Sequence, residues 1–229
     1  MRVVHGRASD PEADRDVTAT LLEDAAETGV PSLRVWSPHR QLAFGRRDTR
    51  AEGYDAAREA AEERGYPAVE RSVGGRAVAY TGTTLAFANA RPVEDMRRGL
   101  DDRYDDAVAT VVRALETVGV DAERGEPPES FCPGAHSVQS AGKIAGVAQR
   151  VRKGAALVSG CVLVADHEEI ARVLDPVYAA LSVPFDPDSV GSVARAGGEG
   201  DAEAVARALE DAFVGDLEAS VERVGAEVD

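Results

Sequence analysis

The chain has 229 residues, 44% of them hydrophobic, so it can bury the core of one large domain. Its 41 acidic and 26 basic residues give a net charge of −15, and such an acidic surface argues against nucleic-acid binding, which needs a basic face. No apolar run approaches the length of a membrane span, and the first residues lack the apolar stretch of a signal peptide. We therefore expect a cytoplasmic protein with no membrane contact, in which Cys132 and Cys161 stay reduced.

Lysine is almost absent from the chain. Only Lys143 and Lys153 are lysines, and every other basic residue is an arginine. Abundant acids with so few lysines are typical of proteins from halophiles; an ordinary acidic cytosolic protein is the alternative. At molar salt the Debye length falls to about 3 Å, so partner recognition would rest on short-range contacts. The lysine kept at position 143 indicates a need for an amine, because an amine can lose its proton when desolvated and guanidinium cannot.

The first half of the chain alternates helices with short strands. Apolar residues at helical spacing predict a helix within residues 8–28, which Gly29 and Pro31 end. A second helix, rich in Ala and Glu, is expected over residues 54–64. Strands are predicted at 33–36, 41–45 and 84–88, and residues 69–80 read as two further strands joined by a turn at Gly74 and Gly75.

The second half contains the clearest helix, over residues 101–118, which Gly119 ends. One face of this helix is apolar and consists of Tyr104, Val108, Val111, Val112, Leu115 and Val118. Further predicted elements are a loop at 125–134, adjacent strands at 144–151 and 156–165 with a turn at 152–154, and helices at 167–182 and 201–223 separated by a loop. Strands and helices alternate irregularly, which predicts an α/β or α+β fold: a mixed sheet with helices packed on it.

Cys132 is the first candidate for chemistry. It lies in a loop where Pro133 and Gly134 favour a turn that exposes the side chain. A thiol accepts an acyl group only as thiolate, which a neighbouring cation stabilises, and Lys143 and His136 are the local candidates for that cation. Alternatively, Cys132 is a small buried apolar residue and His136 a solvated loop residue. Cys161, inside an apolar strand, is predicted to be structural.

The Gly74-Gly75 pair is the second candidate. Two glycines allow the backbone to approach a ligand closely, with N–H groups turned toward it. Arg71 and Arg76 flank the pair and are suited to bind a carboxylate, phosphate or carbonyl. The alternatives are an ordinary tight turn and surface ion pairs. The histidines are scattered without metal-ligand spacing, and no P-loop or dinucleotide fingerprint is present, so no metal site is expected.

Two stretches together resemble the lipoate-protein ligase A/octanoyltransferase superfamily, which shares its catalytic fold with biotin-protein ligases. Residues 71–80, followed by 84–87, are similar to the family's Arg-x-(Ser/Thr)-Gly-Gly-x-Ala-Val element and the strand after it. Residues 142–150, Gly-Lys-Ile-Ala-Gly-Val-Ala-Gln-Arg, are similar to the family's lysine loop. Residues 33–45 resemble its early strand pair. The resemblance covers roughly residues 10 to 185.

The resemblance implies a biotin/lipoate-protein-ligase-like catalytic fold and an acyl-transfer function. We therefore expect a single catalytic domain over residues 1–229, with its core at 10–185 and a C-terminal helical segment at 186–229. The family joins octanoyl or lipoyl groups to one lysine of a lipoyl carrier domain, in the glycine cleavage H protein or 2-oxoacid dehydrogenase E2. Its ligases activate the free acid with ATP and Mg²⁺, its octanoyltransferases use acyl carrier protein as donor, and its amidotransferases move the group between lipoyl domains through a cysteine.

The segment 130–134, Ser-Phe-Cys-Pro-Gly, is similar to the cysteine segment of the Cys-dependent branch, especially the amidotransferases. We therefore predict an octanoyl or lipoyl transferase that works through a thioester on Cys132 and needs no cofactor. An ATP- and Mg²⁺-dependent lipoate-protein ligase and a non-catalytic acyl-binding protein are the alternatives. The sequence departs from the family pattern in two places. Ser137 and Gln139 stand where ligases often carry an acidic residue or Asn, and Val73 stands where the family often has Ser, Thr or Gly.

The predicted mechanism gives each residue a role. Cys132 attacks the acyl donor, and Lys143 binds the acyl carbonyl, stabilises the oxyanion and keeps Cys132 ionised. Lys143 or His136 removes the proton of the incoming carrier lysine. The remaining predicted substrate-binding residues are Arg71, Gly74, Gly75, Arg76, Ala77, Gly146 and Ala148.

Overall fold

The computed structural model describes residues 1–71 and 74–225. Eight strands form its larger sheet: β1 (Arg2–His5), β2 (Ser32–Trp36), β6 (Thr84–Pro92), β7 (Glu123–Arg124), β8 (Ser137–Gln139), β9 (Lys143–Arg152), β10 (Ala155–Leu163) and β11 (Ser220–Arg223). Their order is β11-β1-β2-β6-β10-β9-β8-β7. β1 is parallel to both of its neighbours and the other pairs are antiparallel. The predicted mixed sheet is confirmed.

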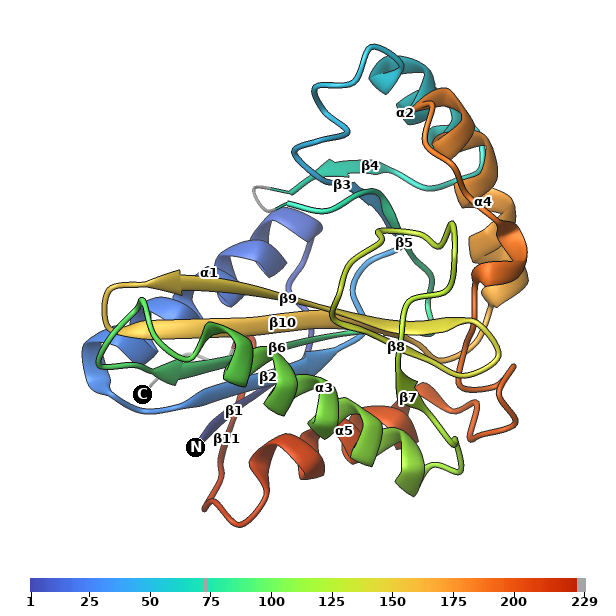
Figure 1. Ribbon diagram of the computed structural model, residues 1–229. Helices are drawn as coiled ribbons and strands as arrows, with labels where there is room; N and C mark the ends of the chain where they lie inside the picture. Colours follow the sequence, from blue (N-terminus) through green and yellow to red (C-terminus); the bar gives the residue numbers. More distant parts are fainter. Residues whose placement is uncertain (72–73, 226–229) are drawn as a thin grey trace.

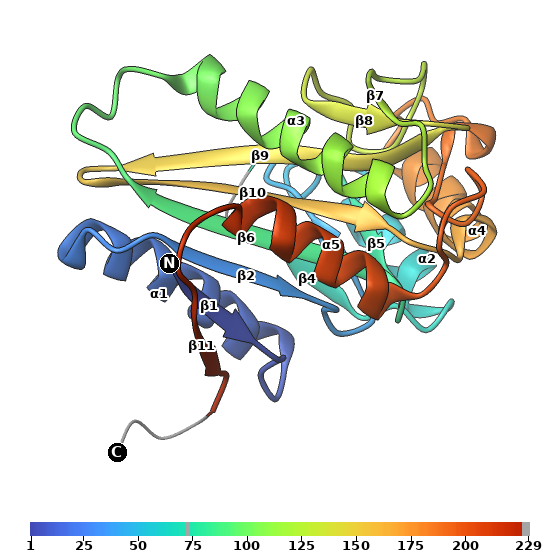
Figure 2. The same cartoon turned by 90° about the horizontal axis from the view of Figure 1, so that it is seen from below.

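Helices cover both faces of this sheet (Figures 1 and 2). α1 (Pro11–Thr28) packs on one face, and α3 (Leu100–Thr117) and α5 (Ala202–Val214) pack side by side on the other. α1 ends where the sequence predicts, because Gly29 closes it in the left-handed conformation at a φ of 72°. The main core lies under α3 and α5 and includes Val111, Leu115 and Leu209, all 0% exposed.

A second, smaller layer lies beside one end of the main sheet. β3 (Gln41–Phe44), β4 (Ala68–Glu70) and β5 (Val78–Tyr80) form a three-stranded sheet in the order β4-β3-β5. α2 (Tyr54–Glu62) and α4 (His167–Ala180) pack on each other, and a short 3-10 turn, η1 (Pro187–Ser189), contacts α4. This layer has its own apolar cluster, against which Cys132 packs. The small sheet, α4 and the main sheet thus meet around Cys132.

The prediction that residues 69–80 form two strands joined by a turn is wrong in one respect. β3 lies between β4 and β5, parallel to the first and antiparallel to the second, so these strands are not neighbours. The chain between them passes close to the end of β3, where a Cβ on Gly45 would collide with the carbonyl of Gly75. The sequence could not reveal this, because β4 and β5 each pair with a strand from another part of the chain.

The C-terminal part differs from the predicted helix at 201–223. α5 ends at Val214, and residues 220–223 form β11, which pairs with β1 across nearly the whole chain. Val193, Leu209 and Phe213 from this part belong to the main core, so it does not form a separate helical layer. The strands β1, β7 and β8, which have two to four residues each, were also not predicted.

The adjacent strands predicted around residues 144–165 are confirmed as the antiparallel pair β9-β10 at the centre of the sheet. Their register runs from Ala155 opposite Arg152 to Val162 opposite Ala145, which places Lys143 at the beginning of β9. In the described part of the chain, no helix combines the length and apolar character needed to cross a membrane.

Candidate active site

Cys132 lies in the loop between β7 and β8, with its side chain half-buried. Its backbone has a φ of 41°, a left-handed conformation that is uncommon outside glycine. The Sγ atom accepts a hydrogen bond from the backbone N–H of Arg76 at 3.3 Å. The Cys132 N–H donates to Tyr178 Oη at 2.6 Å, and this hydroxyl in turn donates to the Ala77 carbonyl at 2.9 Å. Tyr178 on α4 therefore ties the Cys132 loop to the chain leading into β5.

Lys143 is 1% exposed, and its Nζ atom is surrounded by acceptors. It donates to the carbonyls of Phe131 at 3.0 Å and Cys132 at 2.9 Å, and it lies 3.1 and 3.0 Å from the two carboxylate oxygens of Glu126. Gly146 lies next to this side chain, and a Cβ there would make an ordinary van der Waals contact, 3.6 Å from Lys143 Cε. Lys143 thus contacts the backbone of Cys132 and not its sulfur.

Glu126 and Tyr178 were not predicted as site residues. Glu126 also accepts a hydrogen bond from the Ser130 hydroxyl, so it joins two parts of the same loop to Lys143. A lone buried lysine does require a carboxylate, but the sequence offers 41 acids and does not indicate which one. For Tyr178, the only signal is a tyrosine on the apolar face of a helix, whose buried hydroxyl needs a partner.

Arg71 and Arg76 have different partners. Arg76 forms an ion pair with Asp48, Nη1 to Oδ1 at 3.0 Å, and Asp48 is 0% exposed. Arg71 donates to the Arg76 carbonyl. Burial opposes the charged form of Arg71, and the neighbouring Tyr80 and Cys132 side chains more than offset this and raise its pKa. Arg71 therefore holds the Arg76 carbonyl, and its guanidinium lies beside Gly75, as the Cys132 sulfur does.

Of the Gly74-Gly75 pair, predicted to approach a ligand, Gly75 lies close to the Cys132 side chain. Its φ is 92°, and a Cβ there would stand 2.8 Å from Cys132 Sγ and 3.6 Å from Arg71 Nη2. At Gly74 an added Cβ would meet no atom within 4 Å. The Gly75 backbone thus lies directly against the sulfur. Val73, where the sequence departs from the family pattern, lies outside the described residues.

The side chains of His136 and Ala148 make their contacts away from the Cys132 sulfur. The His136 ring stacks on Tyr104 of α3, with centroids 3.6 Å apart and an interplanar angle of 5°. Its Nδ1 atom lies 3.1 Å from Arg124 Nη2, and burial together with the charge of Arg124 lowers its pKa. Ala148 is exposed on β9, opposite Ser159 of β10. His136 links the Cys132 loop to α3, and no hydrogen bond joins it to Cys132 in the described residues.

Cys161 is 6% exposed in β10, as its predicted structural role requires. Burial, and next the proximity of Cys132, raise the pKa of its thiol. Both cysteines are free, and both contact the apolar cluster under α4. The less buried of the two, Cys132, is the thiol that a reactant can reach.

The charges around Cys132 are nearly balanced. Lys143 is paired with Glu126, and Arg76 with Asp48. Arg71 lies beside Gly75 near Cys132 and forms no ion pair among the described residues. Among the described residues, the charge of Arg71 therefore remains as the positive charge beside Cys132. This arrangement is suited to a cysteine nucleophile that reacts with an uncharged acyl group.

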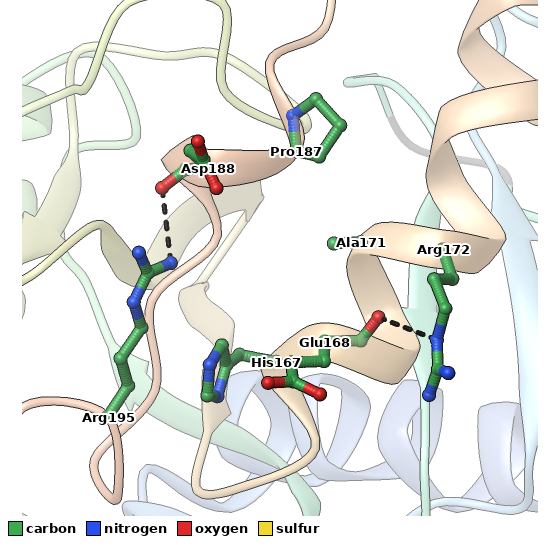
Figure 3. A pocket seen from close by; sticks show the side chains of 7 residues that line it. All are labelled: His167, Glu168, Ala171, Arg172, Pro187, Asp188 and Arg195. Atoms are coloured by element: carbon green, nitrogen blue, oxygen red, sulfur yellow. Dashed lines mark hydrogen bonds between the residues drawn. The ribbon is translucent and has the colours of Figure 1, made fainter.

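A separate pocket of about 400 Å³ lies at the beginning of α4. Figure 3 shows that its lining comes from α4 and from the segment after it: His167, Glu168, Ala171, Arg172, Pro187, Asp188 and Arg195. Arg172 and Arg195 donate to the carbonyls of Glu168 and Asp188, so part of their hydrogen-bonding capacity is already used. None of the predicted site residues lines this pocket.

Comparison with known proteins identifies the family. A family model described as the lipoyl protein ligase A/B catalytic domain matches residues 10–214, which is most of the chain. The chain belongs to this family. The lipoyl protein ligase A/B fold that the resemblance implied is thus confirmed.

Curated relatives carry the name octanoyl-GcvH:protein N-octanoyltransferase. The protein from Geobacillus kaustophilus is 30% identical over 144 residues, which are 59% of this chain and 51% of that protein. The protein from Exiguobacterium sibiricum is 30% identical over 165 residues, or 70% of this chain and 59% of that one. The chain thus spans only about half the length of the curated relatives it matches.

Solved structures of lipoyl protein ligases share the fold. A lipoate-protein ligase A bound with ATP superposes with a TM-score of 0.78 at 20% identity, covering 97% of this chain and 88% of the other. A putative lipoate protein ligase from T. acidophilum with bound lipoic acid gives 0.72 at 21% identity, covering 97% and 87%. At these identities the agreement concerns the arrangement of the backbone.

Proposed function

We propose that this protein is a cysteine-dependent acyltransferase that moves an octanoyl or lipoyl group onto a lysine of a lipoyl carrier domain. The observation that carries the proposal is the setting of Cys132, whose sulfur accepts a hydrogen bond from the N–H of Arg76 and lies, like the Arg71 guanidinium, against the Gly75 backbone. The relatives' name, which specifies octanoyl-GcvH as donor, supports an octanoylated carrier domain as the acyl source. Acyl carrier protein is the second donor to test.

In the first step, the Cys132 sulfur attacks the carbonyl carbon of the donor's octanoyl-lysine amide. The S–C bond forms, the C–N bond breaks, and the donor amine leaves with the proton that the thiol gives up. In the second step, the amine of the acceptor lysine attacks the thioester, and the thiol recovers its proton. One lysine amide replaces another, so the overall exchange is nearly balanced in free energy and we propose that it needs neither ATP nor Mg²⁺.

The other residues position the sulfur and the acyl group. Lys143 holds the carbonyls of Phe131 and Cys132 and so stabilises the left-handed conformation of the Cys132 loop. The partly buried members of the apolar cluster next to Cys132, such as Tyr80 and Phe185, offer a surface for the acyl chain. At about 0.8 kcal/mol for each buried methylene, an eight-carbon chain supplies several kcal/mol of binding free energy.

The test is intact-mass measurement of the protein after incubation with octanoylated GcvH and, separately, with octanoyl-acyl carrier protein. We expect one octanoyl group on Cys132, released by hydroxylamine, with whichever donor the enzyme uses. The variant Cys132→Ser is expected to carry no thioester and to lose transfer. Cys161→Ala is the control and is expected to be acylated like the wild type, because Cys161 is buried.

Two results of this experiment would contradict the proposal. If neither donor leaves an adduct, and the carrier is instead modified from free lipoate with ATP and Mg²⁺ by both wild type and Cys132→Ser, the protein is a ligase and the proposal is wrong. Full transfer by Cys132→Ser from an acylated donor would also contradict it.

A further inference from the structure

The ammonium of Lys143 has more acceptors than hydrogens. A lysine ammonium carries three N–H groups. Four oxygens lie within 3.1 Å of Nζ: both carboxylate oxygens of Glu126 and the carbonyls of Phe131 and Cys132. The two carbonyls are fixed by the loop backbone. A carboxylate oxygen of Glu126 is therefore the partner that a substrate can replace with least rearrangement, since the ion pair survives through the other oxygen.

The charge of the acyl group therefore determines whether the site binds a substrate. The carbonyl oxygen of an amide or thioester is uncharged, so it can take one N–H of Lys143 while Glu126 keeps the ammonium neutralised. A free carboxylate would place a second negative charge next to Glu126, which is only 25% exposed and poorly screened by water. Arg76 is neutralised by Asp48, and Arg71 donates to the Arg76 carbonyl, so among the described residues neither guanidinium forms an ion pair with Glu126.

We propose that Glu126 is a specificity-determining residue that restricts the site to uncharged acyl donors and excludes free fatty acids. The inference rests on the proposed function, because it places the reacting carbonyl beside Lys143. Glu126 makes the otherwise cationic lysine site neutral before a substrate arrives. Its removal would expose the charge of Lys143 to any carboxylate that enters.

The test compares two ligands of nearly the same shape, octanoate and octanamide, on the Cys132→Ser background at neutral pH. Binding is measured by calorimetry, so no acyl transfer is required. We expect the protein with Glu126 intact to bind octanamide more tightly than octanoate. In Glu126→Gln, the ratio of the two dissociation constants is expected to shift toward octanoate at least tenfold. Glu126→Ala, which also leaves Lys143 without its carboxylate, is expected to shift the ratio in the same direction.

Glu129→Gln is the matched control. It makes the same change of charge in the same loop, but the Glu129 side chain is exposed. The ratio is expected to stay at the value of the parent protein. An unchanged ratio in both Glu126 variants, or failure of octanamide to bind the parent, would overturn the inference. Neither result depends on acylation of Cys132, so a failure of the proposed function would be seen separately by mass.

Discussion

At the scale of single residues, the site depends on how closely the backbone approaches the Cys132 sulfur. Two left-handed residues face each other there, Cys132 at a φ of 41° and Gly75 at 92°. The left-handed conformation of a residue with a Cβ costs about 1 to 2 kcal/mol, and Lys143 offsets it at Cys132 by binding two successive carbonyls. Position 75 has glycine because no side chain fits between its backbone and the sulfur.

Gly75→Ala tests this close approach. The new Cβ would stand 2.8 Å from Cys132 Sγ, so the sulfur must move or the loop must open. We expect acylation of Cys132 to slow by about 100-fold, as displacements of about 1 Å do in other active sites. Gly82→Ala is the control, because a Cβ at Gly82 meets no atom within 4 Å. Single-turnover acylation measured by mass gives both rates, and a Gly75→Ala rate equal to the control would contradict the idea.

The sequence predicted some of these residues and not others, for a physical reason. Cys132, Lys143 and Gly75 lie in short motifs whose chemistry is local. Glu126 and Tyr178 act through contacts that span 17 and 46 residues of chain, and no periodicity or turn signal indicates such a pair. That Lys143 contacts the acyl carbonyl stays a prediction. It is supported by the four oxygens around the Lys143 ammonium, one more than its three N–H groups, because an acyl carbonyl can replace one oxygen of Glu126.

At the scale of elements, α4 positions the Cys132 loop although it contributes no group to the reaction. Its Tyr178 hydroxyl bridges the N–H of Cys132 and the carbonyl of Ala77, which come from two segments that are not otherwise neighbours in sequence. Helices such as α1 were predictable because their caps and apolar spacing are local. The pairing of β11 with β1 could not be predicted, because each strand has four residues and its partner lies at the other end of the chain.

Tyr178→Phe tests the bridge. The ring stays, but the N–H of Cys132 and the carbonyl of Ala77 lose a partner in a buried place. Each buried polar group left unpaired costs about 1 to 3 kcal/mol, so we expect a lower free energy of unfolding and slower acylation of Cys132. Urea denaturation and mass measurement give the two values.

Tyr54→Phe is the matched control for Tyr178→Phe. The Tyr54 hydroxyl donates to Glu70 in an exposed position, and the ring packs edge-on against Phe44, a contact that phenylalanine keeps. We expect its stability to change by less than about 0.5 kcal/mol and its acylation rate to stay at the wild-type value. Equal behaviour of the two variants would mean that the bridge has no role.

At the scale of the whole molecule, the two ends of the chain are part of one structure. β11 adds to the edge of the main sheet through β1, and α5 packs against β2, β6 and α3. The sequence predicts a helical segment at residues 186–229, after the core, because the resemblance to the family covers only residues up to about 185. The apolar residues Val205, Leu209 and Phe213, spaced four residues apart, instead face the main core and are almost fully buried.

Leu209→Ala tests whether this C-terminal part is required for the whole domain. Leu209 is 0% exposed, and truncating a buried leucine to alanine costs about 2 to 5 kcal/mol through lost burial and the cavity left behind. We infer that α5 and the main sheet unfold together, so the loss should appear as a lower midpoint of a single transition, with an unchanged dependence on denaturant. Leu217→Ala is the control, since Leu217 is 46% exposed and its truncation removes little buried surface. A second transition for α5 alone, with acylation of Cys132 intact after it, would show that the C-terminal part is an appendage.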